Sequence, residues 1–344
     1  MKAFILQEYN KFENIDMDRP VIKRDDEVLI RVKACGICGS DIHGMDGSTG
    51  RRIPPVVMGH EASGMIAEVG NNVTQWVKGD KVTFDSTIYC GKCHFCRLGQ
   101  INLCDNRRVA GVSCEEYRQH GAFAEYVVVP QHILYRLPEG ITFEQAAMVE
   151  ALSIAFHAVK RTPIRLNDTA VVVGAGMIGL LVIQSLRLAG CGKIIAVDID
   201  EGKLAVAKKW GADFGFNSLR VNVEEEVLRL THNRGADCVF EVVGISLAVS
   251  TGINVIKKGG SLTLVGNLSA KIDFPLQAVV TREITLYGSC GSNGEYPACM
   301  DMIVCKKIDV DSLISAVAPL SEGASWFKRL YDKEPGLMKV ILTP

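Results

Sequence analysis

The sequence predicts an α/β fold with two domains, in which a β-rich N-terminal part precedes a doubly wound parallel sheet. Length is the first observation behind this prediction, because 344 residues exceed the roughly 100–200 residues of one ordinary domain. The second is that the first 140 residues read as short strands and turns. The third is that apolar strands alternate with helical segments from Asn167 onward, which is typical of a parallel sheet covered on both faces.

Composition excludes several classes of protein. The 38 basic and 39 acidic side chains leave a net charge of −1, so no basic surface for nucleic acid or anionic lipid is expected. The uncharged stretch 169–185 approaches the length of a membrane span, but its regularly spaced glycines indicate strand, turn and helix. The first residues lack the pattern of a signal peptide. We therefore expect a cytoplasmic protein that binds neither nucleic acid nor a membrane.

The first domain is expected to consist mainly of short strands. Its β-rich segments, broken by glycine, aspartate and asparagine, are residues 27–38, 62–70, 81–84 and 123–129. Thr142 and Gln145 have the spacing of a capping box, which predicts a helix from there to about Lys160.

The second domain is expected to be built from βα units. Strands are predicted at residues 169–173, 193–199, 236–244, 261–267 and 283–289, and helices at 177–190, 201–212 and before about 257. The tail after Cys290 mixes helical and strand signals and ends in an apolar run. The pattern does not say which domain this tail joins.

A glycine-rich turn in the second domain predicts a dinucleotide site. Gly174, Gly176 and Gly179 form GxGxxG directly after a strand and at the start of a helix, where backbone N–H groups can bind a pyrophosphate. The next strand ends in Asp198, where a carboxylate that binds ribose hydroxyls belongs. That carboxylate would repel a 2′-phosphate, so NAD is predicted over NADP. Lys203 lies within reach of the adenosine ribose by sequence, although a solvated helix residue is the alternative.

Four of the twelve cysteines predict a structural zinc site. Their spacing is CxxCxxC followed after seven residues by the fourth, at Cys90, Cys93, Cys96 and Cys104. Four thiolates close a tetrahedral zinc shell with no open position. A bacterial iron–sulfur motif would have a shorter last gap and a following proline, whereas Asp105 follows here.

A second group of potential metal ligands is dispersed along the chain. Cys38, the pair His60-Glu61 and Glu150 would each have an ordinary reading alone, as a buried thiol, a core histidine and exposed carboxylates. Their interpretation as a site depends on the surrounding pattern.

That pattern resembles the zinc-containing medium-chain dehydrogenase/reductase family, and its polyol dehydrogenase branch, which is sorbitol dehydrogenase-like, most closely. The segments CGICGSDIH, GHEASGMIAEVG, MVEALS and VGAGMIGL and the four-cysteine loop occur in order over essentially the whole chain. The resemblance implies a GroES-like catalytic domain over 1–150, completed by the tail 291–344, and a Rossmann NAD-binding domain over 151–290. It also implies a homodimer or homotetramer and two zinc ions per subunit, one catalytic and one structural.

The resemblance also assigns residues to the site. It makes Cys38 and His60 ligands of the catalytic zinc, with Glu61 or Glu150 as the carboxylate that completes it. It makes Ser40 and His43 a relay that carries the proton of the substrate hydroxyl to solvent. Further contacts to NAD are implied at Met177, Ile178, Val243, Val265, Gly266, Ser289 and Cys290.

The implied reaction is oxidation of a secondary hydroxyl of a polyol, sugar or sugar derivative to a ketone, with transfer of hydride to NAD. Sorbitol itself is in doubt, because Gly291 stands where sorbitol dehydrogenase has an arginine that helps to hold the polyol. A dehydrogenase of threonine, a simple alcohol or a diol is the alternative, and a non-catalytic zinc- and NAD-binding protein is a remote one. Arg51 and Arg52 are interpreted as solvated surface residues, with a substrate phosphate as their alternative partner.

Overall fold

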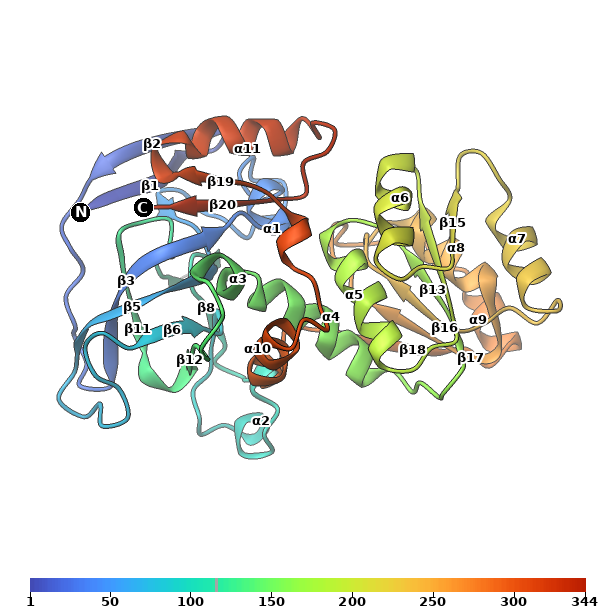
Figure 1. The fold of residues 1–344 in the computed structure, drawn as a ribbon, viewed down its shortest axis with the longest axis horizontal. Helices are drawn as coiled ribbons and strands as arrows, with labels where there is room; N and C mark the ends of the chain where they lie inside the picture. Colours follow the sequence, from blue (N-terminus) through green and yellow to red (C-terminus); the bar gives the residue numbers. More distant parts are fainter. Residues whose placement is uncertain (115–116) are drawn as a thin grey trace. The chain divides into compact units, whose positions relative to one another are not determined.

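The computed structural model describes residues 1–114 and 117–344, which form two compact units (Figure 1). The first unit comprises Met1–Glu150 and Ser292–Pro344, and the second comprises Ala151–Gly291. The two units are described separately below.

The first unit is organised around a seven-stranded sheet with the order β12-β6-β5-β3-β20-β19, in which β11 also pairs with β3. Its strands are β3 (Glu27–Gly36), β5 (Glu61–Val69), β6 (Lys81–Phe84), β11 (Tyr126–Pro130), β12 (Leu134–Arg136), β19 (Ile314–Pro319) and β20 (Lys339–Thr343). The C-terminal strand β20 runs antiparallel to β3, with Ile341 opposite Gly36. The end of the chain is therefore part of the sheet that begins near the N-terminus.

A smaller sheet with the order β2-β1-β4 lies in the same unit. It consists of β1 (Lys2–Glu8), β2 (Lys11–Asp16) and β4 (Val56–Val57), and the short pairs are β7 (Thr87–Ile88) with β8 (Arg108–Val109) and β9 (Ser113–Cys114) with β10 (Tyr117–Arg118). The helices that begin in this unit are α1 (Gly39–Ile42), α2 (His94–Arg97), α3 (Phe143–Ala147), α4 (Val149–Arg161), α10 (Tyr296–Val304) and α11 (Gly323–Tyr331). Phe327 of α11 packs against Phe12 and Phe123, with ring centroids 4.5 and 5.8 Å away, so the tail shares the core of the first strands.

The capping box predicted at Thr142 and Gln145 is present, with both reciprocal hydrogen bonds. The single helix predicted from there to about Lys160 is wrong in one respect. Met148 donates its N–H to the carbonyl of Gln145, three residues back, so a tighter turn separates α3 from α4.

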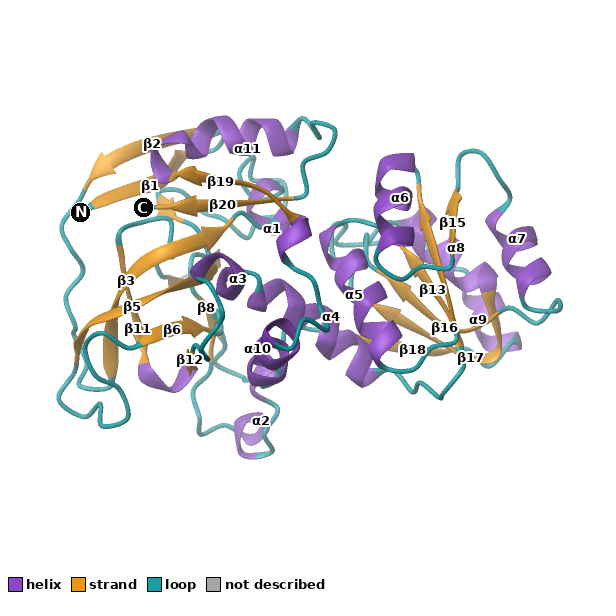
Figure 2. Cartoon of the chain, in the orientation of Figure 1, coloured by secondary structure: helices purple, strands orange, loops and turns teal. Residues whose placement is uncertain are grey.

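The second unit contains a six-stranded sheet in which every pairing is parallel, with the order β15-β14-β13-β16-β17-β18. Its strands are β13 (Thr169–Val173), β14 (Lys193–Asp198), β15 (Phe214–Asn217), β16 (Ala236–Glu241), β17 (Ile256–Leu264) and β18 (Thr285–Gly288), and its helices include α5 (Met177–Leu188), α6 (Glu201–Lys209), α7 (Val223–Leu230), α8 (Ser246–Val255) and α9 (Leu276–Thr281). Helices lie on both sides of this sheet (Figure 2). Val171, Val239 and Leu262 are completely buried, as expected of strands covered on both faces.

The strand order of this sheet fixes the position of a ligand site. The chain runs outward from β13 through β14 to one edge and then from β16 to the other edge, which is the dinucleotide-binding order. In such sheets ligands bind beyond the carboxyl ends of the strands, at the point where the order reverses. That point is the end of β13, at Gly174. The predicted α/β fold class is confirmed.

Among the described residues, we find no helix with the length and apolar character that a membrane crossing needs.

Candidate active site and metal centres

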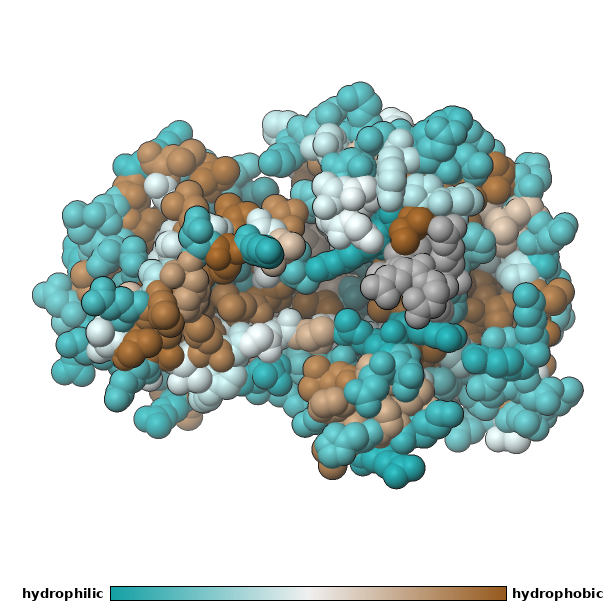
Figure 3. All heavy atoms as spheres, turned by 180° about the vertical axis from the view of Figure 1, so that it is seen from behind, coloured by the Kyte–Doolittle hydropathy of each residue, from teal (hydrophilic) through white to brown (hydrophobic). Residues whose placement is uncertain are grey.

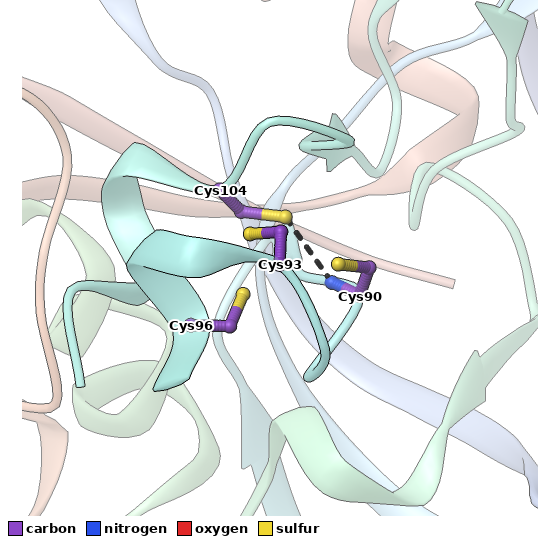
Figure 4. A group of neighbouring side chains, drawn as sticks. All are labelled: Cys90, Cys93, Cys96 and Cys104. Atoms are coloured by element: carbon purple, nitrogen blue, oxygen red, sulfur yellow. Dashed lines mark hydrogen bonds between the residues drawn. The ribbon is translucent and has the colours of Figure 1, made fainter. Parts of the chain in front are cut away.

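The four cysteines of the predicted structural site converge in one loop. Their ligand atoms all lie within 4.8 Å of one another, and the side chains point toward a common centre (Figure 4). Helix α2 begins after Cys93, and the 3₁₀ turn Ile101–Leu103 leads into Cys104. All four sulfur atoms thus come from one loop, in which the N–H of Ile101 also donates to Asn293 Oδ1 of the tail at 3.0 Å.

The environment of these sulfur atoms differs from one cysteine to the next: it favours a thiolate at Cys90, whereas burial and the neighbouring thiols raise the pKa of Cys96 to about 12. The backbone N–H groups of Cys90 and Asn106 donate to Cys104 Sγ at 3.3 and 3.4 Å. Hydrogen bonds from the backbone of Lys92 and Cys93 lower the pKa of the Cys90 thiol to about 6. Thiolates are the form that binds zinc, and four of them leave no open coordination position, so the residues fit a structural zinc ion.

A second group brings together Cys38, His60 and Glu61, whose ligand atoms also lie within 4.8 Å of one another. Cys38 is the N-cap of α1, and its Sγ accepts a hydrogen bond from the backbone of Ser40. Glu61 is the first residue of β5 and pairs with Gly36 of β3. His60 and Glu61 are buried. One sulfur, one imidazole and one carboxylate fit a zinc ion with a position left for substrate or water.

His60 faces Asp41, a residue that the sequence analysis did not single out. Asp41 Oδ1 lies 3.5 Å from His60 Nδ1, which leaves Nε2 as the nitrogen for a metal. Burial opposes ionisation of Asp41, but His60 and Arg52 outweigh it and hold the pKa of this carboxyl well below its usual range. The position of Asp41, three residues after Cys38 on α1, was the available signal.

Glu61 is balanced by Lys339, which the sequence analysis also missed. Lys339 Nζ lies 2.5 Å from Glu61 Oε2 and donates to the carbonyl of Ile37 at 3.1 Å. Both side chains of the ion pair are buried, so each compensates the charge of the other. Because Lys339 is separated from Glu61 by 278 positions, nothing in the local spacing could reveal the pair.

Glu150 is not a member of the three-residue group, among the residues that the structure describes. It lies in the first turn of α4. Burial raises its pKa to about 7; His60 opposes this shift, and the negative charges of Glu61 and Asp85 add to it. The structure therefore brings Glu61, rather than Glu150, together with Cys38 and His60.

The predicted relay residues both belong to α1 and its end. Ser40 Oγ lies 3.3 Å from Cys38 Sγ, and His43 is the exposed C-cap residue of the helix. Exposure of both side chains at one end of the ligand group is compatible with proton exchange with solvent.

One expectation about the surface is wrong. Arg51 is exposed as predicted, but Arg52 is only 2% exposed, and its Nη2 lies 2.7 Å from Asp41 Oδ1. The physical reason is Asp41 itself, since a buried carboxylate needs a nearby positive charge.

The glycine-rich turn of the second unit has the geometry of a dinucleotide site. Gly174 has φ of 102°, and a Cβ there would lie 2.7 Å from a methyl group of Val243. A Cβ on Gly179 would overlap the carbonyl oxygen of Gly174, so both positions require glycine. No atom lies near the place of a Cβ on Gly176, the N-cap of α5 that precedes Met177 and Ile178. This open space beside free N–H groups fits a pyrophosphate.

Asp198 lies at the end of β14 and is fixed by the turn. Its Oδ2 accepts a hydrogen bond from the N–H of Ala175 at 2.7 Å, and its Oδ1 accepts from Ile199 and Asp200 at 2.8 and 3.0 Å. The carboxylate therefore lies at the same sheet edge as the glycines, where a ribose would bind.

The remaining predicted cofactor residues follow strands or begin a helix of this unit. Val243 follows β16 and donates its N–H to Glu241 Oε1, while Val265 and Gly266 follow β17 and donate to the Glu241 carbonyl. The others are Ser289 and Cys290 after β18, and Lys203 in the first turn of α6, whose N–H donates to Asp200. The strand-end residues belong to the carboxyl edge of the sheet, where ligands bind.

Comparisons with known proteins agree with this arrangement. A family model described as "Alcohol dehydrogenase GroES-like domain" matches residues 24–139, and one described as "Zinc-binding dehydrogenase" matches residues 178–304. D-xylulose reductase A of Aspergillus oryzae is 35% identical over 333 residues, covering 94% of this chain and 92% of that protein.

Solved structures give the same result. Galactitol-1-phosphate dehydrogenase from Escherichia coli is 27% identical with a TM-score of 0.91, and the match covers all of both chains. 2R,3R-butanediol dehydrogenase from Bacillus subtilis is 28% identical with a TM-score of 0.88, covering 100% of this chain and 99% of that one. The predicted family is confirmed: the chain belongs to the zinc-containing medium-chain dehydrogenase/reductase family.

Proposed function

We propose that this protein oxidises a secondary hydroxyl of a polyol, sugar or sugar derivative to a ketone and passes the hydride to NAD. The observation that carries the proposal is the group of half-buried Cys38 and buried His60 and Glu61, which combines the donor types of an open zinc site. Two relatives support the polyol class by the activities in their names, a D-xylulose reductase and a galactitol-1-phosphate dehydrogenase.

In the first unit, one set of residues would bind zinc and another would transfer the proton of the substrate hydroxyl. Zinc, when bound by Cys38, His60 and Glu61, supplies a Lewis acid that lowers the pKa of the substrate hydroxyl. Ser40 then accepts the hydroxyl proton and passes it toward His43, which can release it to solvent near neutral pH. Glu150 lies outside the ligand group and would hold water beside it.

The second unit would hold the cofactor. The N–H groups at the start of α5 would bind the pyrophosphate beside Gly176, and Asp198 would accept hydrogen bonds from the ribose hydroxyls. The contacts at Met177, Ile178, Val243, Val265, Gly266, Ser289, Cys290 and Lys203 belong to the same proposal.

A dehydrogenase of simple diols is the second candidate. The resemblance of the fold to a 2R,3R-butanediol dehydrogenase favours it, since the same ligand group could act on a smaller secondary alcohol. A purely structural zinc- and NAD-binding protein is disfavoured, because the ligands of the open site lie together.

Turnover of a substrate panel tests the proposed reaction. We expect NADH formation at 340 nm with NAD and one class among pentitols, hexitols, inositols, sugar phosphates, butanediol and threonine. His60→Ala should lower kcat by about a thousandfold or more, since a Lewis acid contributes several kcal/mol to the transition state. His232→Ala, a change at an exposed histidine of the second unit, should leave kcat unchanged. Equal activity of the His60 variant and the wild type would contradict the assignment.

We propose two zinc ions per chain, one in each ligand group. Metal analysis of the purified protein should give two equivalents of zinc, and Cys96→Ser should reduce the content to one, because three sulfur ligands no longer close the structural shell. Cys305→Ser removes an exposed cysteine outside both groups and should retain two equivalents. A single equivalent in the wild type would contradict the second site.

The choice of cofactor depends on Asp198. Asp198→Ala should raise the KM for NAD about 10- to 100-fold, because hydrogen bonds to a charged group contribute roughly 1.5–3 kcal/mol, and should narrow the preference for NAD over NADP. Asp200→Ala is the matched control, since Asp200 caps α6 by accepting from the N–H of Lys203. Asp200→Ala should lower thermal stability and leave the ratio of the KM for NADP to the KM for NAD unchanged. An unaltered ratio in the Asp198 variant would argue for a role in the turn alone.

We also propose a homodimer that forms through the second unit. Strand β18 is an edge strand of the parallel sheet, and an unprotected edge favours pairing with another chain. Exposed apolar side chains occur on β18 and α9, at Leu286, Leu276 and Val280. Figure 3 shows hydrophobic side chains gathered on the surface of this unit.

Sedimentation of charged variants tests the dimer. The double variant Leu276→Glu/Val280→Glu should shift the protein from dimer to monomer, because two carboxylates would have to be desolvated in the interface. Leu166→Glu places the same charge at a residue that is 86% exposed elsewhere in the unit and should leave the dimer intact. A monomeric wild type would contradict the proposal.

A further inference from the structure

We propose that Arg52 is a positioning residue for the reaction, which holds the Ser40 hydroxyl and the Asp41 carboxylate in a fixed relation to the Cys38–His60–Glu61 group. The inference rests on the proposed function for the part that concerns Ser40. The part that concerns Asp41 depends only on metal binding by the group.

The contacts of the guanidinium carry the inference. Arg52 Nη2 lies 2.7 Å from Asp41 Oδ1 and 3.3 Å from Ser40 Oγ, and Nη1 donates to the carbonyl of Arg51 at 3.2 Å. One nitrogen therefore joins the proposed relay hydroxyl to the carboxylate that orients His60. The Arg52 side chain is 2% exposed and Asp41 is fully buried, so the contact between these two is protected from competition by water.

The aliphatic part of the Arg52 side chain packs closely against Gly44. A Cβ placed on Gly44 would lie 2.6 Å from Arg52 Cγ and 2.9 Å from the carbonyl oxygen of Ser40. Only a residue without a side chain lets the backbone after α1 approach the arginine this closely. The fork of the guanidinium is thereby fixed against the end of the helix that carries Ser40 and Asp41.

The contact with Ser40 limits where its hydroxyl hydrogen can point. Arg52 has donors and no acceptor, so Ser40 Oγ must accept from it. The hydroxyl hydrogen is then free for another acceptor, and Cys38 Sγ lies 3.3 Å away in the ligand group. A positive charge beside Oγ also stabilises the negative charge that develops on this oxygen while a proton passes through it.

The contact with Asp41 limits how that carboxylate meets His60. Asp41 Oδ1 is shared between Arg52 and His60 Nδ1, and Oδ2 accepts from the N–H of Cys38 at 3.3 Å. Loss of the guanidinium would leave a buried carboxylate without its nearest charged partner and free to turn. A substrate anchor is a poorer reading of Arg52, because both Nη atoms are already bonded within the protein and the side chain is buried.

The rate of zinc release tests, without any substrate, whether Arg52 positions Asp41; this is the Asp41 arm of the proposal. Protein loaded with zinc is mixed with a chromogenic chelator, and two release phases are expected, one for each ligand group. Arg52→Gln should speed release from the Cys38 group about 10- to 100-fold, as partners of metal ligands commonly do when they are removed. Release from the four-cysteine loop should stay unchanged and serves as the internal control for folding. Unchanged rates in both phases would overturn this arm.

A double-mutant cycle of Arg52→Gln and Ser40→Ala tests whether Arg52 positions the Ser40 hydroxyl; this is the Ser40 arm of the proposal. Arg52→Gln should lower kcat about 100-fold in the parent enzyme, within the usual range for a proton-transfer contribution, with little change in KM. In the Ser40→Ala enzyme the same change should lower kcat less than about fivefold, because the hydroxyl that Arg52 orients is already missing. Equal losses in both backgrounds, or a rise in KM alone, would overturn this arm.

Two more variants complete the test. Arg52→Lys keeps the charge without the fork and should restore part of kcat and of zinc retention; if Arg52→Gln yields no folded protein, wild-type values in Arg52→Lys would overturn the inference. Arg51→Gln, at the exposed neighbour, should match the wild type with a substrate that carries no phosphate. If the wild type oxidises no member of the panel, the proposed function fails, and zinc release still decides the role of Arg52.

Discussion

The buried ion pair between Glu61 and Lys339 is the interaction on which the first unit depends. A carboxylate at the start of β5 would be costly to bury alone, and its partner comes from the first position of the last strand. The catalytic sheet is therefore complete only when the C-terminal tail has returned and β20 has paired with β3. Because the same carboxylate belongs to the ligand group, the strand that completes the sheet also supplies the charge that Glu61 needs.

The other side of the ligand group repeats the arrangement with Asp41 and Arg52. Here too a buried acid beside a metal ligand is matched by a buried base from a separate segment. The Asp41–Arg52 pair adds no net charge beside the ligands, whereas Lys339 compensates the charge of Glu61, which is itself a ligand. The two pairs also fix His60 and Glu61 from behind, which limits the loss of side-chain freedom when the metal binds.

Sequence reasoning succeeded where the chemistry is local. GxGxxG with Asp198 predicted a turn in which Gly174 and Gly179 do require the absence of a side chain, and the spacing of the four cysteines predicted a loop that brings their sulfur atoms together. It failed where a partner is distant: Lys339 was not noticed, and Arg52 was expected at the surface. It left Glu61 and Glu150 undecided, because the two differ in the elements that carry them rather than in spacing. The break at Met148 also escaped it, since no proline or glycine marks that position.

The contrast between the two proposed metal sites has a physical basis. All ligands of a site that only has to hold an ion can lie within fifteen consecutive residues, here Cys90 to Cys104. Nearby backbone N–H groups, such as that of Cys90, donate hydrogen bonds to the sulfur atoms. A site that must keep one position open has to exclude other ligands from it, which demands a rigid frame. That frame is drawn from α1, β5 and β20 together with the segment around Arg52, four parts of the chain that meet only in the folded unit. Substrate preference can then change through residues outside the frame, while the charged pairs that hold the ligands stay the same.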